Sequence, residues 1–523
     1  MRKLLSIFLA LSLLCALTAC GSTNTGNSAE QEAEKDAIQT SFSEENTVSS
    51  TEEKTVESTA DFPGGPPSGD RPGDPPDGNG GPGETPPGDP PDGNGGPGGN
   101  PPGGFSGGMP GGGPGGSSAD IDYSGAVEIN SADSQSGQTY ASTSADESAL
   151  LISTDADVTI SDPNITKTGD SDGGDNCSFY GLNAAVLVKD GATASITGGT
   201  ISSDAMGANG VFCYGGNGGQ NGASGDGTTL IIRDTTIVTT GDGSGGIMTT
   251  GDGITCAYDL AVETSGRSSA AIRTDRGGGI VVVDGGTYTS NGLGSPAIYS
   301  TADITVSNAN LISNLSEGVC IEGLNSITLN DCDLIANNTQ CNGNATFLDT
   351  IMIYQSMSGD AASGTSHFTV TGGSLTSKSG HVFHVTNTTA VSTLTGVEII
   401  NEDADKILLS VCADGWSGGS NITTLKAIRQ KLEGTILVGS DSSLTLELTD
   451  GSTFVGNISG DITNAKGTAV STEIGTVSVT LDSTSTWTLT GDVYITEFNG
   501  DASNIVSNGY TLYVNGVALT GTK

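Results

Sequence analysis

The chain has 523 residues, of which 60 are acidic and 18 are basic, giving a formal net charge of −42 at pH 7. This charge excludes a protein that binds the backbone of nucleic acids, because such proteins cluster Lys and Arg against phosphate. It equally disfavours electrostatic attachment to an anionic membrane surface. With 81 glycines and only 15% charged residues, a helical bundle is excluded as well. An all-β protein with a disordered part remains.

Residues 1–19 are expected to be a signal peptide. Arg2 and Lys3 precede an apolar stretch, 4–17, that is too short to span a bilayer comfortably. The stretch ends in Leu-Thr-Ala-Cys-Gly at 17–21, which resembles the bacterial lipobox, whose cysteine receives diacylglycerol. We therefore expect an extracytoplasmic protein that is anchored to the cell membrane through lipidated Cys20. An ordinary secretory signal with a chance cysteine is the alternative.

Residues 20–118 are expected to be a disordered linker. The first part is rich in Ser, Thr and Glu and has almost no large apolar residues, so it cannot bury a core. The second part, 62–118, holds 16 of the 18 prolines, and the string GDPPDGNGGPG occurs in it twice, at 73–83 and 88–98. Glycine does not occupy every third position, which excludes a collagen triple helix. We interpret this segment as a spacer in front of a domain at 119–523.

Within residues 119–523, short β-branched runs alternate with turns of Gly, Asn, Asp and Ser, a pattern typical of strands and turns. Two series of runs interleave without exception. The first series, exemplified by ASITGGTIS, has its apolar residue before the turn at positions 160, 196, 232, 262, 283, 306, 329, 370 and 394. The second series, exemplified by AAVLV, is centred on positions 186, 211, 247, 272, 298, 319, 351, 382 and 409.

The shortest gaps in the first series are 21–24 residues, and inserted loops account for the longer ones. Propellers built from four-stranded blades repeat about every 40 residues. The shorter period predicts an all-β fold, a right-handed parallel β-helix of about 11–13 coils stacked at about 4.8 Å, with an internal apolar ladder and Gly or Asn at corners of positive φ. Residues 425–433 are expected to be strand-like despite their helical spacing, and 479–523 to end in coils and a cap.

Acidic loop residues are candidate calcium ligands. The loop GDSDGGDN places Asp170, Asp172 and Asp175 close together in a glycine-rich segment, and Ca²⁺ takes six to eight oxygen ligands from flexible loops of this kind. The loops around Asp242 and Asp252 are weaker candidates. Loops that are merely solvated are the alternative for all five residues.

The segment AAIRTDRGGG is a candidate ligand site, because residues 119–523 contain only 13 Lys and Arg and two of them are three residues apart here. If Ile272 faces inward, alternation along the strand turns Arg273 and Asp275 toward solvent together. An arginine fork binds carboxylates at two points, so Arg273, Asp275 and Arg276 are expected to bind an acidic sugar. An Arg–Asp pair that steadies a glycine-rich corner is the alternative.

The histidines and cysteines indicate structural roles rather than a zinc or redox site. His381 and His384 lie in one strand, an odd number of residues apart, so they are expected to point to opposite faces. A disulfide from loop residue Cys177 or Cys341 stays open. Three further cysteines fall in strands of the second series and are expected to join the internal ladder: Cys213, Cys320 and Cys412.

The lipobox, the Gly/Pro linker and the motifs GLNAAVLV, AAIRTDRGGG, VVVDGGTYTSNGLGSPAIYSTADITVSNA and MIYQSMSGDA resemble a group of clostridial and related bacterial β-helix lipoproteins of the pectate-lyase-like superfamily. The resemblance covers roughly residues 125–520. It implies a non-catalytic, calcium-containing polysaccharide-binding protein. The R-x-P-x-x-R run of the pectate lyases is absent, and so are the N-T-D, D-D, G-H-G and R-I-K motifs of the polygalacturonases.

We therefore expect a cell-surface lipoprotein that binds acidic, plant or cell-wall polysaccharide without catalysis, with Ca²⁺ between acidic loops and sugar carboxylates. Such bridging would relieve the repulsion between an acidic chain and a polyuronate. Two alternatives stay open: a polysaccharide lyase or glycoside hydrolase of the same fold, and an adhesin that contacts other proteins. The identity of the sugar, the number of ions and the oligomeric state do not follow from the sequence.

Overall fold

The β-branched runs of the sequence form short strands, and three consecutive strands enter three different sheets before the pattern repeats. The computed structural model describes residues 121–171, 174–218 and 224–523, all within one unit that begins at Gly112. The expected signal peptide, Cys20 and the whole of the expected linker, together with Asp172, lie outside the described residues.

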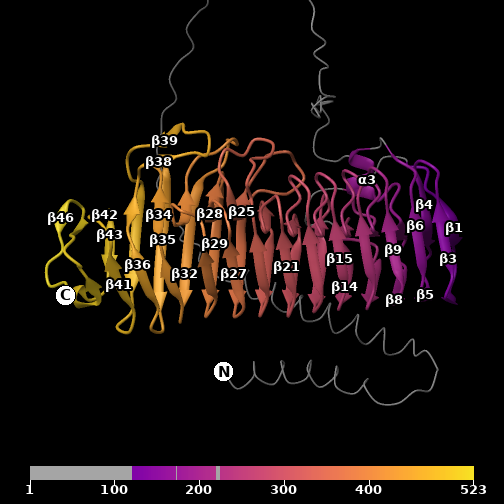
Figure 1. Ribbon diagram of the computed structural model, residues 1–523, viewed down its shortest axis with the longest axis horizontal. Coiled ribbons are helices and arrows are strands. Elements are labelled where there is room, and N and C mark those ends of the chain that lie inside the picture. Colours follow the sequence, from indigo (N-terminus) through magenta and orange to yellow (C-terminus); the bar gives the residue numbers. More distant parts are fainter. Residues whose placement is uncertain (1–120, 172–173, 219–223) are drawn as a thin grey trace, which may run out of the picture. The chain divides into compact units, whose positions relative to one another are not determined.

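Three long sheets form the walls of the fold (Figure 1). Sheet B has 14 strands, from β2 (Asp133–Ser136) to β43 (Glu497–Asn499), and sheet C has 10, from β3 (Thr139–Ser142) to β30 (Glu398–Asn401). Sheet A has 13 strands: β1 (Ser124–Ile129), β4 (Glu147–Ser153), β7 (Val186–Lys189), β10 (Val211–Tyr214), β13 (Ile247–Thr250), β16 (Ile272–Thr274), β19 (Ile298–Ser300), β22 (Val319–Glu322), β25 (Asp349–Tyr354), β28 (His381–Thr386), β31 (Ile407–Val411), β34 (Thr435–Val438) and β37 (Ile458–Ser459).

Neighbouring strands within each of these sheets are parallel, and nearly all of them are separated by two strands of the chain, as in β16, β19 and β22. The chain therefore winds as a right-handed parallel β-helix, which confirms the predicted fold class. The sequence pattern showed two strands in each coil, and the structure has three. The run before each turn lies in sheet B and the apolar residue after the turn lies in sheet C, as in β8 (Thr193–Thr197) and β9 (Thr200–Ser203).

The second series of runs forms an internal column of sheet A. Val186, Val211, Ile247, Ile272, Ile298, Val319 and Ile351 are consecutive register partners and belong to one continuous core. Each of these side chains is at most 1% exposed, and burying one contributes about 1.5–3 kcal/mol. The column then continues to Phe383 rather than Val382, so the predicted centre at 382 is wrong by one residue.

The first series contains one wrong member. Val262 lies in β15 (Ala261–Thr264) of sheet C, next to Ile237. The position in the sheet B column belongs to Ala257 of β14 (Gly253–Tyr258), which pairs with Ile232 and Val283. The irregular gaps of 30 and 21 residues thereby become 25 and 26. Ala257 was missed because its small side chain gives a weak apolar signal.

The corner between sheets B and C needs a left-handed residue in successive coils, which confirms the expected corners of positive φ. Aspartate is more common there than the predicted asparagine, because its short polar side chain also tolerates this region. A Cβ on Gly285 would lie 2.2 Å from Asp259 Oδ1 of the preceding coil, so a side chain at 285 would collide with that aspartate. The corner residues with positive φ include Asp162, Gly198, Asp234, Asp259, Gly285, Asn308, Asp331 and Gly372.

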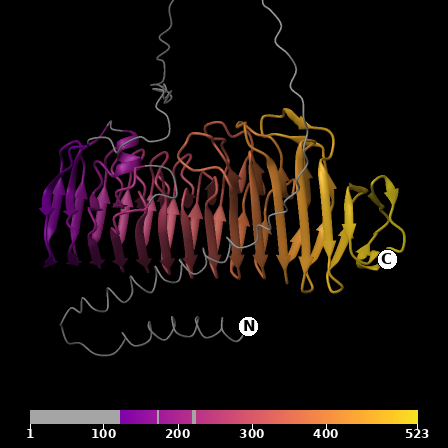
Figure 2. The ribbon, with the colours of Figure 1, turned by 180° about the vertical axis from the view of Figure 1, so that it is seen from behind.

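Longer connections lie beside sheet A. One of them carries α3 (Asp175–Tyr180), and another carries the antiparallel pair β38 (Ile462–Thr463) and β39 (Ala469–Ser471). Both elements lie along the same long edge of the β-helix in Figures 1 and 2. The turn from sheet B to sheet C stays short, as between β17 (Gly279–Asp284) and β18 (Thr287–Ser290). Insertions are therefore concentrated around sheet A.

The C-terminal part keeps the strand pattern. The segment 425–433 lies in β32 (Asn421–Ile428) and β33 (Lys431–Glu433), as predicted. The last strands, β45 (Leu512–Val514) and β46 (Val517–Ala518), pair antiparallel in the segment where the cap is expected. Over the described ranges, which begin at residue 121, no helix has the length and apolar character needed to cross a membrane.

Candidate functional site

The outward-facing side of sheet A divides into covered ends and a more open middle. At one end Phe179 and Tyr180 of α3 pack on Leu187 and Met248, and at the other end Phe347 packs with Cys412 and Leu437. The two ends are joined by one column of register partners: Met248, Arg273, Tyr299, Cys320, Met352, His384, Ser410 and Leu437.

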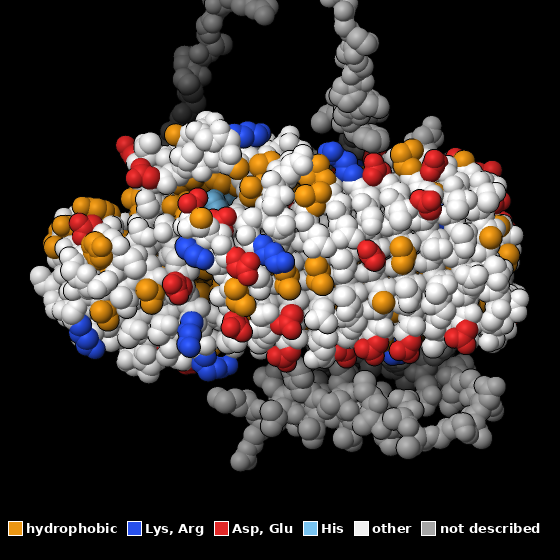
Figure 3. All heavy atoms as spheres, in the orientation of Figure 1, with side chains coloured by type: hydrophobic (Ala, Val, Ile, Leu, Met, Phe, Trp, Pro, Cys, Tyr) orange, Lys and Arg blue, Asp and Glu red, His pale blue; other side chains and the backbone are white. Residues whose placement is uncertain are grey.

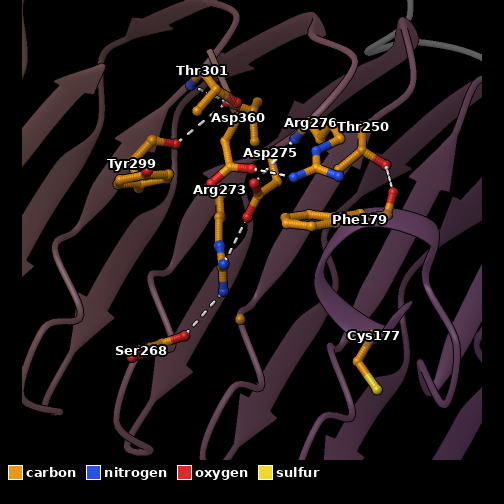
Figure 4. Close-up of polar contacts among 12 residues, drawn as sticks. Cys177, Phe179, Thr250, Ser268, Arg273, Asp275, Arg276, Tyr299, Thr301 and Asp360 are labelled. Carbon is orange, nitrogen blue, oxygen red and sulfur yellow. Dashed lines mark hydrogen bonds and ion pairs between the residues drawn. The ribbon is translucent and has the colours of Figure 1, made fainter. Parts of the chain in front are cut away.

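Arg273 and Tyr299, which follow Met248 in this column, line a pocket. Ser268, Ala270, Gly294 and Pro296 complete its wall, and its volume is about 150 Å³, large enough for several waters or one small polar group. Arg273 Nη1 donates a hydrogen bond of 3.0 Å to the carbonyl oxygen of Ser268, which holds the guanidinium against the wall (Figure 4). The pocket thus combines an aromatic ring with a fixed cation.

Asp275 is buried beside this pocket, which corrects the expectation that it faces solvent. Ile272 does face inward, and Arg273 is partly exposed, but the side chain of Asp275 is only 5% exposed. Strand β16 ends at Thr274, so the alternation of faces stops there. The carboxylate then turns back to accept hydrogen bonds from Arg273 Nη2 at 2.7 Å and from the backbone N–H of Arg276 at 3.0 Å.

Burial has an electrostatic consequence for Asp275. Removal from water raises the pKa of its carboxyl, Arg273 opposes this shift and the nearby Asp360 adds to it, so that the pKa lies at about 6. The ion pair between Arg273 and Asp275 confirms part of the alternative interpretation, in which the two residues steady the chain locally. In this ion pair, Arg273 still lines the pocket.

Arg276 faces away from the pocket and joins two covering segments. Its Nη2 lies 2.7 Å from Asp360 Oδ1, and its guanidinium carbon lies 4.2 Å from the centre of the Phe179 ring. Figure 4 shows Arg276 between the α3 segment and the segment that carries Asp360. The three residues predicted as one ligand cluster are therefore neighbours with different contacts, because Arg273 lines the pocket and Arg276 does not.

Glu322 is a central residue of this region that the sequence analysis missed. It is 1% exposed, and its Oε2 accepts hydrogen bonds from Tyr299 Oη at 2.6 Å and Tyr354 Oη at 3.1 Å. Its Oε1 accepts a hydrogen bond from Ser356 Oγ. Glu322 therefore fixes the Tyr299 ring of the pocket, and it anchors the segment after β25. This role follows from the pairing of Glu322 with Tyr354 in the neighbouring strand. The spacing of residues in the sequence did not predict that pairing.

A second aromatic pair follows on the same side of sheet A. The rings of Tyr354 and Trp416 lie 4.9 Å apart between centroids, and both side chains are half-buried. Tyr354 lies three sheet A strands beyond Arg273, which corresponds to about 14 Å along the axis of the β-helix. The Arg273 pocket and this aromatic pair therefore follow one another along the direction in which the coils stack.

Among the described calcium candidates, Asp170, Asp242 and Asp252 each accept a hydrogen bond from a different backbone N–H. Asp170 Oδ1 accepts a hydrogen bond from the backbone N–H of Met206, and Asp242 Oδ1 accepts one from that of Arg267, each at 2.8 Å. These contacts link each carboxylate to the following coil. Asp252 Oδ2 accepts a hydrogen bond of 2.7 Å from the Gly225 N–H, and burial raises the pKa of Asp252.

Asp175, the remaining described candidate, lies in the first turn of α3. Within residues 121–171, 174–218 and 224–523, no three His, Cys, Asp or Glu side chains are arranged to hold a metal ion. Asp172, between Asp170 and Asp175, is outside the described residues.

His381 and His384 lie on the same side of their strand, so the expectation of opposite faces is wrong. Consecutive residues Val382 and Phe383 both enter the core, which breaks the alternation between the two histidines. The Nδ1 atoms of both rings lie 2.7 Å from Ser410 Oγ. Burial, aided by the nearby His384, lowers the pKa of His381 to about 3.

The cysteines divide between the inside and the outside of the β-helix. Cys213 lies in the main core, as expected. Cys320 instead belongs to the outward column beside Tyr299, and Cys412 packs with Phe347 outside sheet A, so the prediction is wrong for these two. Cys341, a loop residue considered for a disulfide, is a free thiol.

Charged side chains are scattered over the face of the molecule in Figure 3, and acidic ones follow its lower edge. Comparison with protein-family models, with curated proteins and with solved structures finds no match for this chain.

Proposed function

We propose that this protein binds carbohydrate on the outward side of sheet A, without catalysis, at the pocket of Arg273 and Tyr299. The observation that carries the proposal is the pocket itself, in which one aromatic ring and one guanidinium are held in place by buried carboxylates. Binding sites for small polar molecules combine an apolar or aromatic wall with a few fixed polar groups. A sugar ring has this character, since it presents C–H groups on its faces and hydroxyls at its edge.

The proposed ligand is a polysaccharide that follows the stacking direction of the coils. Tyr354 and Trp416 offer a second aromatic surface about 14 Å from Arg273, so one chain of several sugar units would reach both. Tyr and Trp suit this role because they combine a large apolar ring with a polar group. Tyr354 lies in β25 of the 13-stranded sheet, and Trp416 comes from the connection after β31.

The test is affinity electrophoresis of the full-length chain through gels that contain soluble plant and bacterial cell-wall polysaccharides. We expect retardation by at least one of them, and a loss of affinity of about tenfold or more in Tyr299→Ala and in Arg273→Ala. Thr328→Ala, on the outward side of sheet B, is the matched control and should leave the retardation unchanged. Equal loss in the control would contradict the assignment to sheet A.

An activity assay on the same polysaccharides separates binding from catalysis. Release of reducing ends would support a glycoside hydrolase, and unsaturated uronate products would support a lyase. Either result would contradict a purely binding function. If neither binding nor products are detected, the adhesin alternative becomes the better explanation.

Calcium is proposed as a bridge only for acidic polysaccharides. The chain is strongly acidic, so it should repel a polyuronate unless cations intervene. Asp170, Asp172 and Asp175 are the proposed source of ligands. Metal analysis of the purified full-length chain, and retardation by polygalacturonate with and without EDTA, test this part. Retardation that EDTA does not change would contradict the bridge.

We also propose that Cys20 carries the lipid anchor and that residues 20–118 hold the β-helix away from the membrane. The support is the lipobox-like sequence at 17–21 and the Gly/Pro-rich composition that follows. Cys20→Ala should release the protein from the membrane fraction and abolish incorporation of labelled fatty acid. Retention of both in the variant would contradict the anchor.

A further inference from the structure

We propose that Asp275 sets the charge preference of the pocket: by pairing with Arg273 it makes the site select uncharged sugar units over uronates. The inference rests on the proposed carbohydrate-binding function and names the class of ligand. It revises the expectation of an acidic sugar at this position in the absence of calcium.

The guanidinium of Arg273 is not free to hold a carboxylate through its two terminal nitrogens. Both terminal nitrogens of Arg273 already donate hydrogen bonds. Nη2 donates to Asp275 Oδ2 at 2.7 Å, and Nη1 donates to the carbonyl oxygen of Ser268 at 3.0 Å. The fork that binds a carboxylate through two parallel hydrogen bonds uses a pair of such nitrogens. The N–H groups left over suit single hydrogen bonds, which sugar hydroxyls accept, rather than the two-point binding of a carboxylate.

The charges around the pocket are already paired. The side chains of Arg273 and Asp275 are 15% and 5% exposed, so their charges are weakly screened and largely cancel. Arg276, the other nearby cation, is paired with Asp360, and Glu322 is buried behind Tyr299. The pocket therefore carries no net positive charge to offset the desolvation of an incoming uronate.

Protonation of Asp275 would change the charge of the pocket. The charged and titratable groups around it are Arg273 of β16, Arg276 of the following turn, Asp360 of the segment after β25 and Tyr299 of β19. Burial raises the pKa of Asp275 to about 6, so the carboxyl is protonated below that pH. The positive charge of Arg273 is then no longer cancelled by Asp275, while uronates are still ionised. Uronate binding should therefore strengthen as the pH falls.

The experiment compares the full-length chain with Asp275→Asn, which removes the charge and keeps the size. The ligands are polygalacturonate and a panel of neutral soluble polysaccharides (β-glucan, xylan and galactomannan), in EDTA at about pH 8 and about pH 5. Asp461→Asn, an exposed site in the connection after β37, controls for the loss of one negative charge. Circular dichroism and thermal unfolding check that each variant is folded.

We expect the native chain at about pH 8 to bind at least one neutral polysaccharide about tenfold or more tightly than polygalacturonate. Asp275→Asn should raise the affinity for polygalacturonate about fivefold to tenfold and remove its dependence on pH. The Asp461→Asn control should do neither. If Asp275→Asn does not fold, the native pH profile alone decides, because polygalacturonate affinity should rise between about pH 8 and about pH 5.

Two results would overturn the inference. Tighter binding of polygalacturonate than of every neutral polysaccharide, with a flat pH profile in EDTA, would leave carbohydrate binding intact and refute the role of Asp275. Absence of binding to all of these polysaccharides would instead refute the proposed function, and the inference with it. The two failures are therefore distinguishable.

Discussion

The outward sides of sheets A and B are built by the same stacking rule and differ in almost everything else. On sheet B, one column repeats a single residue type, Thr305, Thr328, Thr369 and Thr393, all half-buried. On sheet A, the corresponding column changes from Arg273 to Tyr299 to Cys320. Stacking thus determines where a side chain points, and it leaves its chemistry open.

The connections explain the difference. Between sheets B and C the turn is short and needs a left-handed residue, so an insertion there would disturb every neighbouring coil. The connections beside sheet A carry α3, β38 and β39, together with segments that supply Asp360 and Trp416 to the outward side. Buried charges and aromatic contacts accordingly gather on the side where the chain is free to insert residues.

The largest expected loss of stability compares a glycine at the corner between sheets B and C with a glycine in a connection beside sheet A. Gly373, at the corner between sheets B and C, has φ +64, and an added Cβ would lie 2.0 Å from the Cys332 carbonyl oxygen. Gly373→Ala should lower the free energy of unfolding by about 3 kcal/mol. Gly343, beside sheet A, has φ +57 with no atom within 4 Å, so Gly343→Ala should cost only about 1 kcal/mol. Denaturant unfolding of both variants checks this, and equal losses would contradict it.

The next effect tests the buried network of sheet A. Glu322→Ala leaves the hydroxyls of Tyr299 and Tyr354 without their acceptor and releases Ser356. The variant should lose about 2–3 kcal/mol of stability. It should also become sensitive to protease in the segment 355–363. Thermal unfolding and limited proteolysis measure both effects, and an unchanged cleavage pattern would show that Glu322 does not anchor this segment.

A smaller effect of opposite sign is expected at Asp349. This residue is 1% exposed, its Oδ1 has no hydrogen-bond partner, and burial together with Glu317 and Asp414 raises its pKa well above the ordinary value. A raised folded-state pKa stabilises the fold at low pH, and this stability is lost as the pH rises. Asp349→Asn should therefore unfold at a higher temperature than the native chain at about pH 8, with the gap closing near about pH 4. A gap that widens at low pH would contradict this sign.

The smallest effect is expected on sheet B. Thr328→Val replaces a half-buried hydroxyl in the threonine column and should change the free energy of unfolding by about 0.5 kcal/mol or less. It should not alter the retardation by any polysaccharide. Selective loss of binding in this variant would show that sheet B, rather than sheet A, carries the ligand surface.

The repeat was predictable from the sequence because each coil repeats the same inward pattern. The internal column from Val186 to Ile351 is in register as predicted. The errors at Val262 and Val382 arose where a small residue or a local break interrupts that pattern. The fold could be predicted from short sequence segments because every coil repeats the same spacing of apolar residues and turns.

The candidate site was predictable only in part. The segment with Arg273 and Asp275 stood out because basic residues are rare, and the two side chains do form a pair. The burial of Asp275 and the contact of Arg276 with Asp360 depend on a segment 84 residues further along the chain, which no local pattern reveals. The contacts of Glu322 likewise follow from register between coils.

The most direct test of the account is hydrogen–deuterium exchange of the full-length chain with and without a saturating polysaccharide identified by affinity electrophoresis. We predict protection in β16, β19 and the segment 355–363, with no change in sheet B or at the corner between sheets B and C. Protection on the outward side of sheet B, with none around Arg273 and Tyr299, would contradict the assignment of the binding surface to sheet A.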